Sequence, residues 1–365
     1  MSNVNENLLP STDDSHSAWA RLAKRVLEGH RLGEEEGLAI LRCDDRELLD
    51  LLAAAYRVRY RWFANKVHLN FLVNAKSGLC GEDCKYCSQS AVSQSDVTEY
   101  PLASAETILE GARLAAERRA RTYCIVLAGH RPSEAEMDAI TRVVPRIRAA
   151  FGLKICLSPG LLTAGQAARL KSCGVDRINH NLNTSRRFYP QICTTHSYQD
   201  RLDTIRAVRE AGLEICSGGI VGMGEEDFDV VELALRLGEL AAEAVPVNFL
   251  IPIPGTPLEG VERLNPRYCL KVLALFRLAN PSCELRIAAG RERHLGSLQP
   301  LGLYPASSIF VGDYLTTKGQ PAEEDYRMIE SLGFEIVADH LEAPGRRGDS
   351  ATTPRSPRIH GERGA

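Results

Sequence analysis

Three cysteines in one short segment are the residues of this sequence best placed to do chemistry. The segment GLCGEDCKYCSQS holds Cys80, Cys84 and Cys87 in a C-x3-C-x2-C spacing. Three thiolates are one ligand short of a structural zinc site. Thiolates also hold iron–sulfur clusters, and three of them leave one iron of a four-iron cubane open. The motif therefore predicts a four-iron cluster with an open iron. The alternative is a zinc knuckle with a distant fourth ligand, or simply buried thiols.

Three further cysteines lie in separate β-rich runs: Cys124 in TYCIV, Cys156 in KICLS and Cys216 in EICSGG. A buried cysteine often serves as a small hydrophobic residue, which would explain each one singly. If the three runs belonged to one barrel, the thiolates could converge inside it and would need a metal to neutralise them. Arg286, in ELRIAAG, could point inward with them, or could be a buried guanidinium paired with a carboxylate. The remaining cysteines are interpreted as structural: Cys43, Cys173, Cys193, Cys269 and Cys283.

Asparagines alternate in the run INHNLN, at Asn179, Asn181 and Asn183. Alternate residues of a strand project to one side, so all three would share a face if the strand extends through them. Asparagine is disfavoured in strands. The pattern therefore predicts a hydrogen-bonding site, with capping of the strand end as the alternative. The glycine-rich GGIVGMGE (218–225) is a weaker signal, because glycines also mark tight turns.

The elements that must position these residues are eight short β-rich runs alternating with amphipathic helices. The runs are 67–73, 122–128, 153–158, 175–182, 213–219, 245–251, 283–289 and 308–312. This alternation predicts an α/β fold, a (β/α)8 TIM-type barrel over 64–340, whose active site lies in the loops after the strands. The first cysteine motif follows the first strand. Residues 18–63 are expected to form a helical extension, and the polar ends 1–17 and 341–365 to be disordered.

Composition narrows the class of protein. The net charge of -3 over 365 residues gives no electrostatic basis for general nucleic-acid or membrane-surface binding. No apolar run approaches the ~18 residues of a membrane span, and the N-terminal segment lacks the features of a targeting signal. A cytoplasmic location is therefore expected. In such a chain eleven cysteines favour metal or catalytic roles over disulfides.

The cysteine motif, with Tyr86 before its last cysteine, resembles the signature of the radical S-adenosylmethionine (SAM) superfamily, whose open iron binds SAM. Four further strings resemble the biotin synthase family, and the similarity runs from about residue 45 to 335: ICSGGIVGMGE, INHNLNTS, LRIAAGRE and LTTKGQPAEED. This resemblance implies the conversion of dethiobiotin to biotin by insertion of sulfur between two unactivated carbons. It also implies a flavodoxin-type electron donor, the iron–sulfur assembly machinery as a partner, and a homodimer.

The resemblance also implies roles for individual residues. The 4Fe–4S cluster would be held by Cys80, Cys84 and Cys87, and a 2Fe–2S cluster by Cys124, Cys156, Cys216 and Arg286. SAM would contact Tyr86, Asn181, Asn183 and Ile220, and the substrate would contact Lys76, Asn181 and Asn248. Two positions depart from the family pattern. Asn183 stands where aspartate is frequent, and Thr122 stands where some relatives have an arginine that contacts SAM.

Other functions stay open at this stage. Another radical SAM barrel with different chemistry is one, although such relatives lack the three strand cysteines as a set. Lipoyl synthase also inserts sulfur, but its auxiliary cluster uses an N-terminal cysteine group, and residues 1–79 contain only Cys43. A non-catalytic iron–sulfur sensor would explain the cysteines but not the SAM-like segments.

Overall fold

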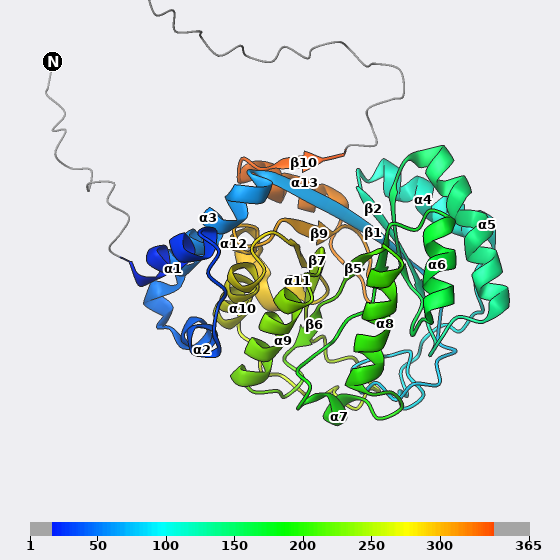
Figure 1. Cartoon of the computed structure of the whole chain (residues 1–365), viewed down its shortest axis with the longest axis horizontal. Helices are drawn as coiled ribbons and strands as arrows, with labels where there is room; N and C mark the ends of the chain where they lie inside the picture. The colour runs from blue at the N-terminus through cyan, green and yellow to red at the C-terminus, as the bar shows by residue number, and fades with distance from the viewer. Residues whose placement is uncertain (1–16, 339–365) are drawn as a thin grey trace, which may run out of the picture.

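A computed structural model describes residues 17–338 of the chain. Its central feature is a closed barrel of parallel strands (Figure 1). The expected tails, 1–17 and 341–365, fall almost entirely outside the described residues. The strands are β1 (Lys66–Lys76), β2 (Thr122–Leu127), β3 (Lys154–Ser158), β4 (Arg177–Asn179), β5 (Glu214–Cys216), β6 (Gly219–Val221), β7 (Ala244–Phe249), β8 (Glu284–Ile287), β9 (Ser308–Phe310) and β10 (Glu335–Val337).

The barrel closes where β1 pairs with β9, at His68 and Ser308. Strands β5 and β6 both pair with β7, so they form the two halves of the fifth barrel strand. They are separated at Ser217 and Gly218, where a Cβ atom on Gly218 would lie 1.8 Å from the carbonyl oxygen of Pro246. Only glycine fits this close approach. The expected (β/α)8 barrel is therefore confirmed, with its fifth strand split in two.

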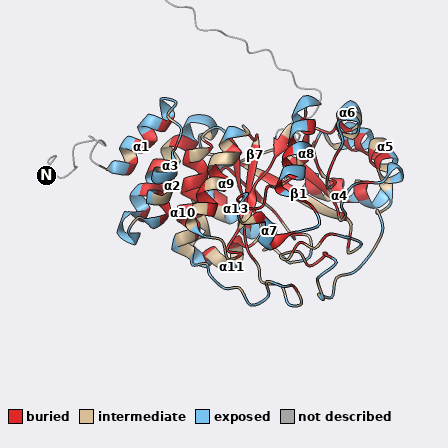
Figure 2. Cartoon of the chain, turned by 60° about the horizontal axis from the view of Figure 1, so that its bottom comes forward, coloured by how far each residue is buried: buried red, intermediate tan, exposed pale blue. Residues whose placement is uncertain are grey.

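Burial follows the layers expected of such a barrel. Figure 2 shows buried residues gathered on the strands and on the helix faces turned toward them, while the outer helix faces are exposed. The strands are short and rich in Val, Ile and Leu, as is usual where a parallel sheet is covered by helices. Alternate residues point into the barrel or out toward the helices.

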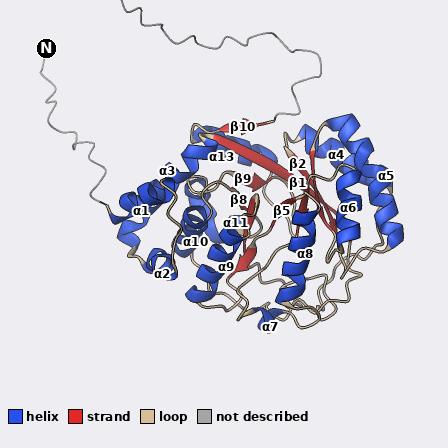
Figure 3. Cartoon of the chain, in the orientation of Figure 1, coloured by secondary structure: helices blue, strands red, loops and turns tan. Residues whose placement is uncertain are grey.

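Helices surround the strands (Figure 3). Several begin with a side-chain cap, including a capping box in which Ser133 and Glu136 bond to each other's backbone N–H groups. The helices of the barrel are α4 (Ala105–Glu117), α5 (Glu134–Phe151), α6 (Ala164–Ser172), α7 (Tyr189–Ile192), α8 (Tyr198–Glu210), α9 (Asp227–Glu239), α10 (Pro266–Ala279), α11 (Arg291–Leu295), α12 (Gln299–Gly302) and α13 (Ala322–Ser331).

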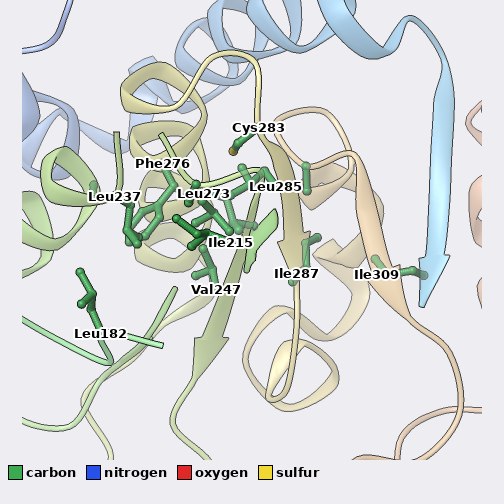
Figure 4. Close-up of a cluster of buried hydrophobic side chains, with 14 of the residues drawn as sticks. Leu182, Ile215, Leu237, Val247, Leu273, Phe276, Cys283, Leu285, Ile287 and Ile309 are labelled. Atoms are coloured by element: carbon green, nitrogen blue, oxygen red, sulfur yellow. The ribbon is translucent and has the colours of Figure 1, made fainter. Parts of the chain in front are cut away.

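The main hydrophobic core lies between the strands and this helical layer. In Figure 4, Leu237 of α9 and Phe276 of α10 pack toward Ile215, Val247 and Leu285 of the strands. A second, smaller cluster lies inside the barrel and holds Cys124, Cys156, Cys216 and Ala244. The larger cluster packs the helices against the strands, and the smaller one holds cysteines of the candidate site.

Three helices precede β1: α1 (Ala18–Leu27), α2 (Glu34–Arg42) and α3 (Leu48–Phe63). Helices α2 and α3 lie against α9 and α10 on one side of the barrel, and α1 packs on α3 (Figure 1). Strand β10, which the sequence analysis did not anticipate, extends the sheet beyond the barrel by pairing with the start of β1. Within residues 17–338, no helix combines the length and apolar character needed to cross a membrane.

Candidate active site

The first cysteine motif lies in the loop after β1, at the carboxyl-terminal mouth of the barrel. Cys80, Cys84 and Cys87 are free thiols, and all three line one cavity. Desolvation raises the pKa of Cys80 and brings that of Cys87 to about 11, so these thiols hold their protons until a metal displaces them. Three soft donors in a partly desolvated loop fit an iron–sulfur cluster.

Two acidic residues inside the motif fasten its loop to the segment before α8. Backbone N–H groups of Thr194 and Thr195 donate to one oxygen of Asp83, at 2.8 and 3.2 Å. Glu82 accepts hydrogen bonds from Thr195 and His196. Burial alone would raise the pKa of Glu82, but these hydrogen bonds hold it below its usual range. The cysteine loop is therefore anchored by charge-assisted hydrogen bonds.

The same anchor reaches the end of β4. Arg201 of α8 bonds to His196 at 2.8 Å through one guanidinium nitrogen and to the carbonyl oxygen of Asn181 at 2.8 Å through another. Glu82, His130 and His196 present ligand atoms within 4.8 Å of one another. Because Arg201 already occupies Nε2 of His196, this group is better suited to holding the loop than to binding a cation.

A cysteine interpreted from sequence as structural contacts the motif. The sulfur of Cys193 lies 3.8 Å from that of Cys84 and 3.4 Å from Nδ1 of His196. The hydrogen bond that Cys84 donates, together with burial, keeps the pKa of Cys84 raised, and the same bond lowers the pKa of Cys193 to about 4. The Cys84 thiol therefore has the sulfur of Cys193 as its hydrogen-bond acceptor.

The cavity has a volume of about 390 Å³ and runs from the cysteine loop into the barrel. This is the size of a small-molecule site. Its walls include most of the predicted site residues: Cys80, Cys84, Tyr86, Cys87, Cys124, Asn181, Asn183, Ile220, Asn248 and Arg286. Lys76, Thr122, Cys156 and Cys216 are not part of its lining.

Asn181 and Asn183 lie in the segment that follows β4, and not in the strand. The alternating asparagines would share a face only if the strand reached Asn183, but β4 ends at Asn179. Asn183 has a φ of 71°. Its Nδ2 donates to the Tyr86 hydroxyl at 2.6 Å, which leaves the carboxamide oxygen as the acceptor for a ligand. The oxygen of Asn181 accepts from Gly218 N–H at 3.1 Å, which leaves its amide nitrogen as a donor.

Three other predicted contacts already have partners in the fold. Asn248 bridges neighbouring strands, donating to Gly219 O at 3.0 Å and accepting from Ala289 N–H at 3.2 Å. The N–H of Ile220 donates to the carbonyl oxygen of Asn183. The ammonium of Lys76 pairs with Glu136 at 2.8 Å and lies near Gly129, a residue of the cavity wall.

The departure at Thr122 also has a structural setting. Thr122 is the first residue of β2 and is only 1% exposed, so it offers the cavity no side-chain contact.

The strand cysteines converge inside the barrel, where Cys124, Cys156 and Cys216 are 5%, 1% and 0% exposed. Cys124 and Cys156 are direct neighbours on β2 and β3. The interaction of Cys156 with the Cys124 thiol is the main reason that the pKa of Cys156 is raised. A donor from Asn179 reaches Cys216 sulfur at 3.2 Å. Three converging thiols form a donor set suited to iron.

Arg286 points into the same interior. Its NH1 lies 3.9 Å from Cys216 sulfur, and its NH2 lies 2.6 Å from a carboxylate oxygen of Glu284. The alternative considered from sequence, a guanidinium paired with a carboxylate, is therefore present in the structure. A second guanidinium, that of Arg177, bonds to the other oxygen of Glu284 at 3.1 Å.

Two known family models match the chain. Residues 76–238 match the family model of the Radical SAM superfamily, and residues 246–335 match that of the Biotin and Thiamin Synthesis associated domain. Among solved structures, methylornithine synthase superposes with a TM-score of 0.76 at 20% identity, over 87% of this chain and 97% of that one. The FeFe-hydrogenase maturase HydG from Carboxydothermus hydrogenoformans gives 0.73 at 16%, over 87% and 79%. At these identities the two structures support the fold alone.

The barrel, the three-cysteine loop and the superfamily match together define a radical SAM enzyme. Curated relatives are more specific. The chain is 58% identical to biotin synthase from Geobacillus kaustophilus, over 87% of this chain and 96% of that protein. It is 53% identical to the enzymes of Rhodopirellula baltica, over 90% and 94%, and of Bacillus subtilis, over 87% and 95%. The chain belongs to the biotin synthase family.

Several residues of the site were missed from sequence. Glu82, His196 and Arg201 anchor the cysteine loop, and Arg177 and Glu284 lie beside the strand cysteines. Glu82 lies inside the motif, but its partners are 48 to 114 positions away. A charged pair within predicted strands, Arg177 and Glu284, was the one available signal, because charged residues are rarely buried without a partner.

Proposed function

We propose that this chain converts dethiobiotin to biotin with SAM and two iron–sulfur clusters, one at each cysteine set. The observation that carries the proposal is the single cavity whose walls include both the loop cysteines and, deeper in the barrel, Cys124 and Arg286. A substrate in this cavity would lie between a radical source at the mouth and a sulfur source inside. Membership of the biotin synthase family supplies the substrate.

Cys80, Cys84 and Cys87 would hold the 4Fe–4S cluster, and Cys124, Cys156 and Cys216 would hold a 2Fe–2S cluster with Arg286 as its fourth group. When bound, the first cluster would supply the electron that cleaves SAM, and the second would supply the sulfur atom. The protein provides binding, orientation and electrostatics, while the cofactors provide the bond chemistry.

The chain's own residues orient the ligands. The free oxygen of Asn183 would accept a hydrogen bond from the SAM ribose, and the Tyr86 ring would lie beside SAM. The amide nitrogen of Asn181 would be available to both ligands, and Asn248 and Ile220 line the same cavity. The enclosing strands and loops exclude bulk water, which protects a reactive carbon radical from side reactions.

Lys76 would have to leave Glu136 to reach the substrate, since its ammonium is paired there and Lys76 is not part of the cavity lining. A flavodoxin-type protein would deliver electrons to the exposed cysteine loop, and the iron–sulfur assembly machinery would load both sites. We also propose that the enzyme is a cytoplasmic homodimer. The family resemblance supports the electron donor, the assembly partner and the homodimer.

An anaerobic assay tests the function. Reconstituted enzyme, SAM, dethiobiotin and a reducing system should yield biotin, and iron and sulfide should match one four-iron and one two-iron cluster per chain. A matched control is Cys173→Ala, which removes a half-buried thiol of α6's C-terminal end outside the cavity. SAM cleavage without biotin, by a chain that holds both clusters, would contradict the proposed substrate.

A further inference from the structure

We propose that Arg177 supplies the second cationic group of the strand-cysteine site, and that Glu284 holds it in place between the thiols and Arg286. This inference rests on the proposed function, because the charge would act on a cluster bound by Cys156 and its neighbours. Neither the cysteine motif nor the family resemblance assigns a role to Arg177 or Glu284.

The pairing of β3 with β4 sets the position of Arg177. Arg177 is paired directly with Cys156 across the two strands. Directly paired residues of adjacent strands project to the same face, so the Arg177 side chain enters the barrel beside Cys156. The side chain is only 4% exposed, and its charge interacts with the thiols of both Cys156 and Cys216.

Two carboxylates hold the guanidinium of Arg177 in this position. Glu284 bonds to Arg177 through one carboxylate oxygen, at 3.1 Å, and to Arg286 through the other, at 2.6 Å. Glu214 bonds to Nε of Arg177 at 2.9 Å from the outer side, and Lys154 pairs with Glu214 at 2.6 Å. Arg177 is therefore fixed by two carboxylates that approach from different strands.

The charges of this network balance at its outer end but not inside the barrel. Glu214 and Lys154 are partly exposed, at 36% and 25%, and they offset each other at the outer end of the network. The inner part holds two buried guanidinium groups, Arg177 and Arg286, against the single carboxylate of Glu284. A net positive charge therefore remains inside the barrel, next to three thiols. If Arg286 loses its proton on joining the cluster, Arg177 is the cation that remains there.

An unbalanced buried charge is costly unless an anion compensates it. A hydrophobic side chain would fill the position of Arg177 at lower cost if packing were its purpose. Three thiolates around a two-iron, two-sulfide core carry a net negative charge, and this charge becomes more negative on reduction. Arg177 carries the opposite sign, so it would stabilise the bound cluster and favour its reduced state.

The test is the midpoint potential of the two-iron component in an anaerobic spectroelectrochemical titration of the reconstituted enzyme. Arg177→Met should shift this potential downward, because a cation that stabilises the reduced state is lost. Glu284→Gln should shift it upward, because an anion is lost. Arg177→Lys should stay near the wild type. Lys154→Met removes the same charge at the partly exposed end, where solvent screens it, and should cause no shift.

The two opposite shifts separate charge from damage to the fold, which would not change sign between variants. The four-iron potential serves as an internal reference and should stay constant. An unchanged potential in Arg177→Met, or shifts of the same sign in Arg177→Met and Glu284→Gln, would overturn the inference. If Arg177→Met fails to load the two-iron cluster, Arg177→Lys must restore loading, and failure of both overturns it equally. A wild-type enzyme without any two-iron component would instead refute the proposed function.

Discussion

Replacement of Asn183 tests the SAM contact, and its backbone decides which replacements are informative. The φ of 71° lies in the left-handed region, which asparagine and glycine adopt more readily than other residues. A leucine there adds roughly 1–2 kcal/mol of strain. Asn183→Gly removes the carboxamide without that strain, so it separates the lost side chain from the altered backbone.

The expected losses follow from the 3% exposure of Asn183 and its one free acceptor. Glycine leaves space for water to replace the acceptor, so about 0.5–1.5 kcal/mol is lost, or roughly 2–13-fold in Kd. Leucine fills the space and leaves a ribose hydroxyl unpaired, which costs about 1–3 kcal/mol, or roughly 5–150-fold. Asn183→Asp keeps an acceptor and should bind SAM nearly as well as the wild type.

Anaerobic calorimetric titration of SAM into enzyme loaded with the four-iron cluster measures all three affinities. Iron content per chain should be equal in the wild type and the variants, because Asn183 is not a ligand. The expected order of affinity is wild type and Asn183→Asp first, then Asn183→Gly, then Asn183→Leu. Wild-type affinity in Asn183→Leu would refute the contact, and Asn183 would then serve only to shape the turn after β4.

Four other outcomes are expected. Cys84→Ala should lose the four-iron cluster and all reductive cleavage of SAM, and normal deoxyadenosine formation would refute the ligand assignment. Cys156→Ala should keep that cluster but lose the two-iron Mössbauer component and biotin formation, whereas a fully active variant would leave it a core residue. Lys76→Met should raise KM for dethiobiotin more than Glu136→Gln does, and equal effects would mean that the pair only joins β1 to α5. Asp229 is buried, which alone would raise its pKa, but hydrogen bonds from Ser185 and Arg187 lower it. Its stabilisation is present above about pH 4 and is lost as the pH falls further, so the urea midpoint of apo Asp229→Asn should fall less than that of the wild type between about pH 5 and pH 3.

The barrel could be predicted from sequence because its signal is local. Each strand appears as a short β-rich run, and the inward positions of Cys124 and Cys216 follow from alternation along their strands. The ends of strands were less predictable. Strand β4 stops at Asn179 because the chain turns toward Asn183, whose backbone bonds to Gly218 and Ile220 of the next strand.

The polar environment of the site depends on contacts between distant segments, which composition and spacing do not reveal. Cys193 was interpreted as structural, yet it touches Cys84 across 109 positions. Arg177 and Glu284 are 107 positions apart and meet only after the barrel has formed. The predicted alternative for Arg286, a carboxylate partner, named the right chemistry without being able to name Glu284.

The pairing of β1 with β9 and β10 has a consequence for how the protein is made. His68 can pair with Ser308 only after Ser308 has emerged from the ribosome. Ser308 lies 240 positions later in the chain, which corresponds to about 12–48 s at typical rates of synthesis. During that interval β2, β3 and β5 have been synthesised, but the barrel around their cysteines is still open along one side. The cysteines of the nascent chain are therefore directly accessible for a period, at a site that the finished barrel encloses.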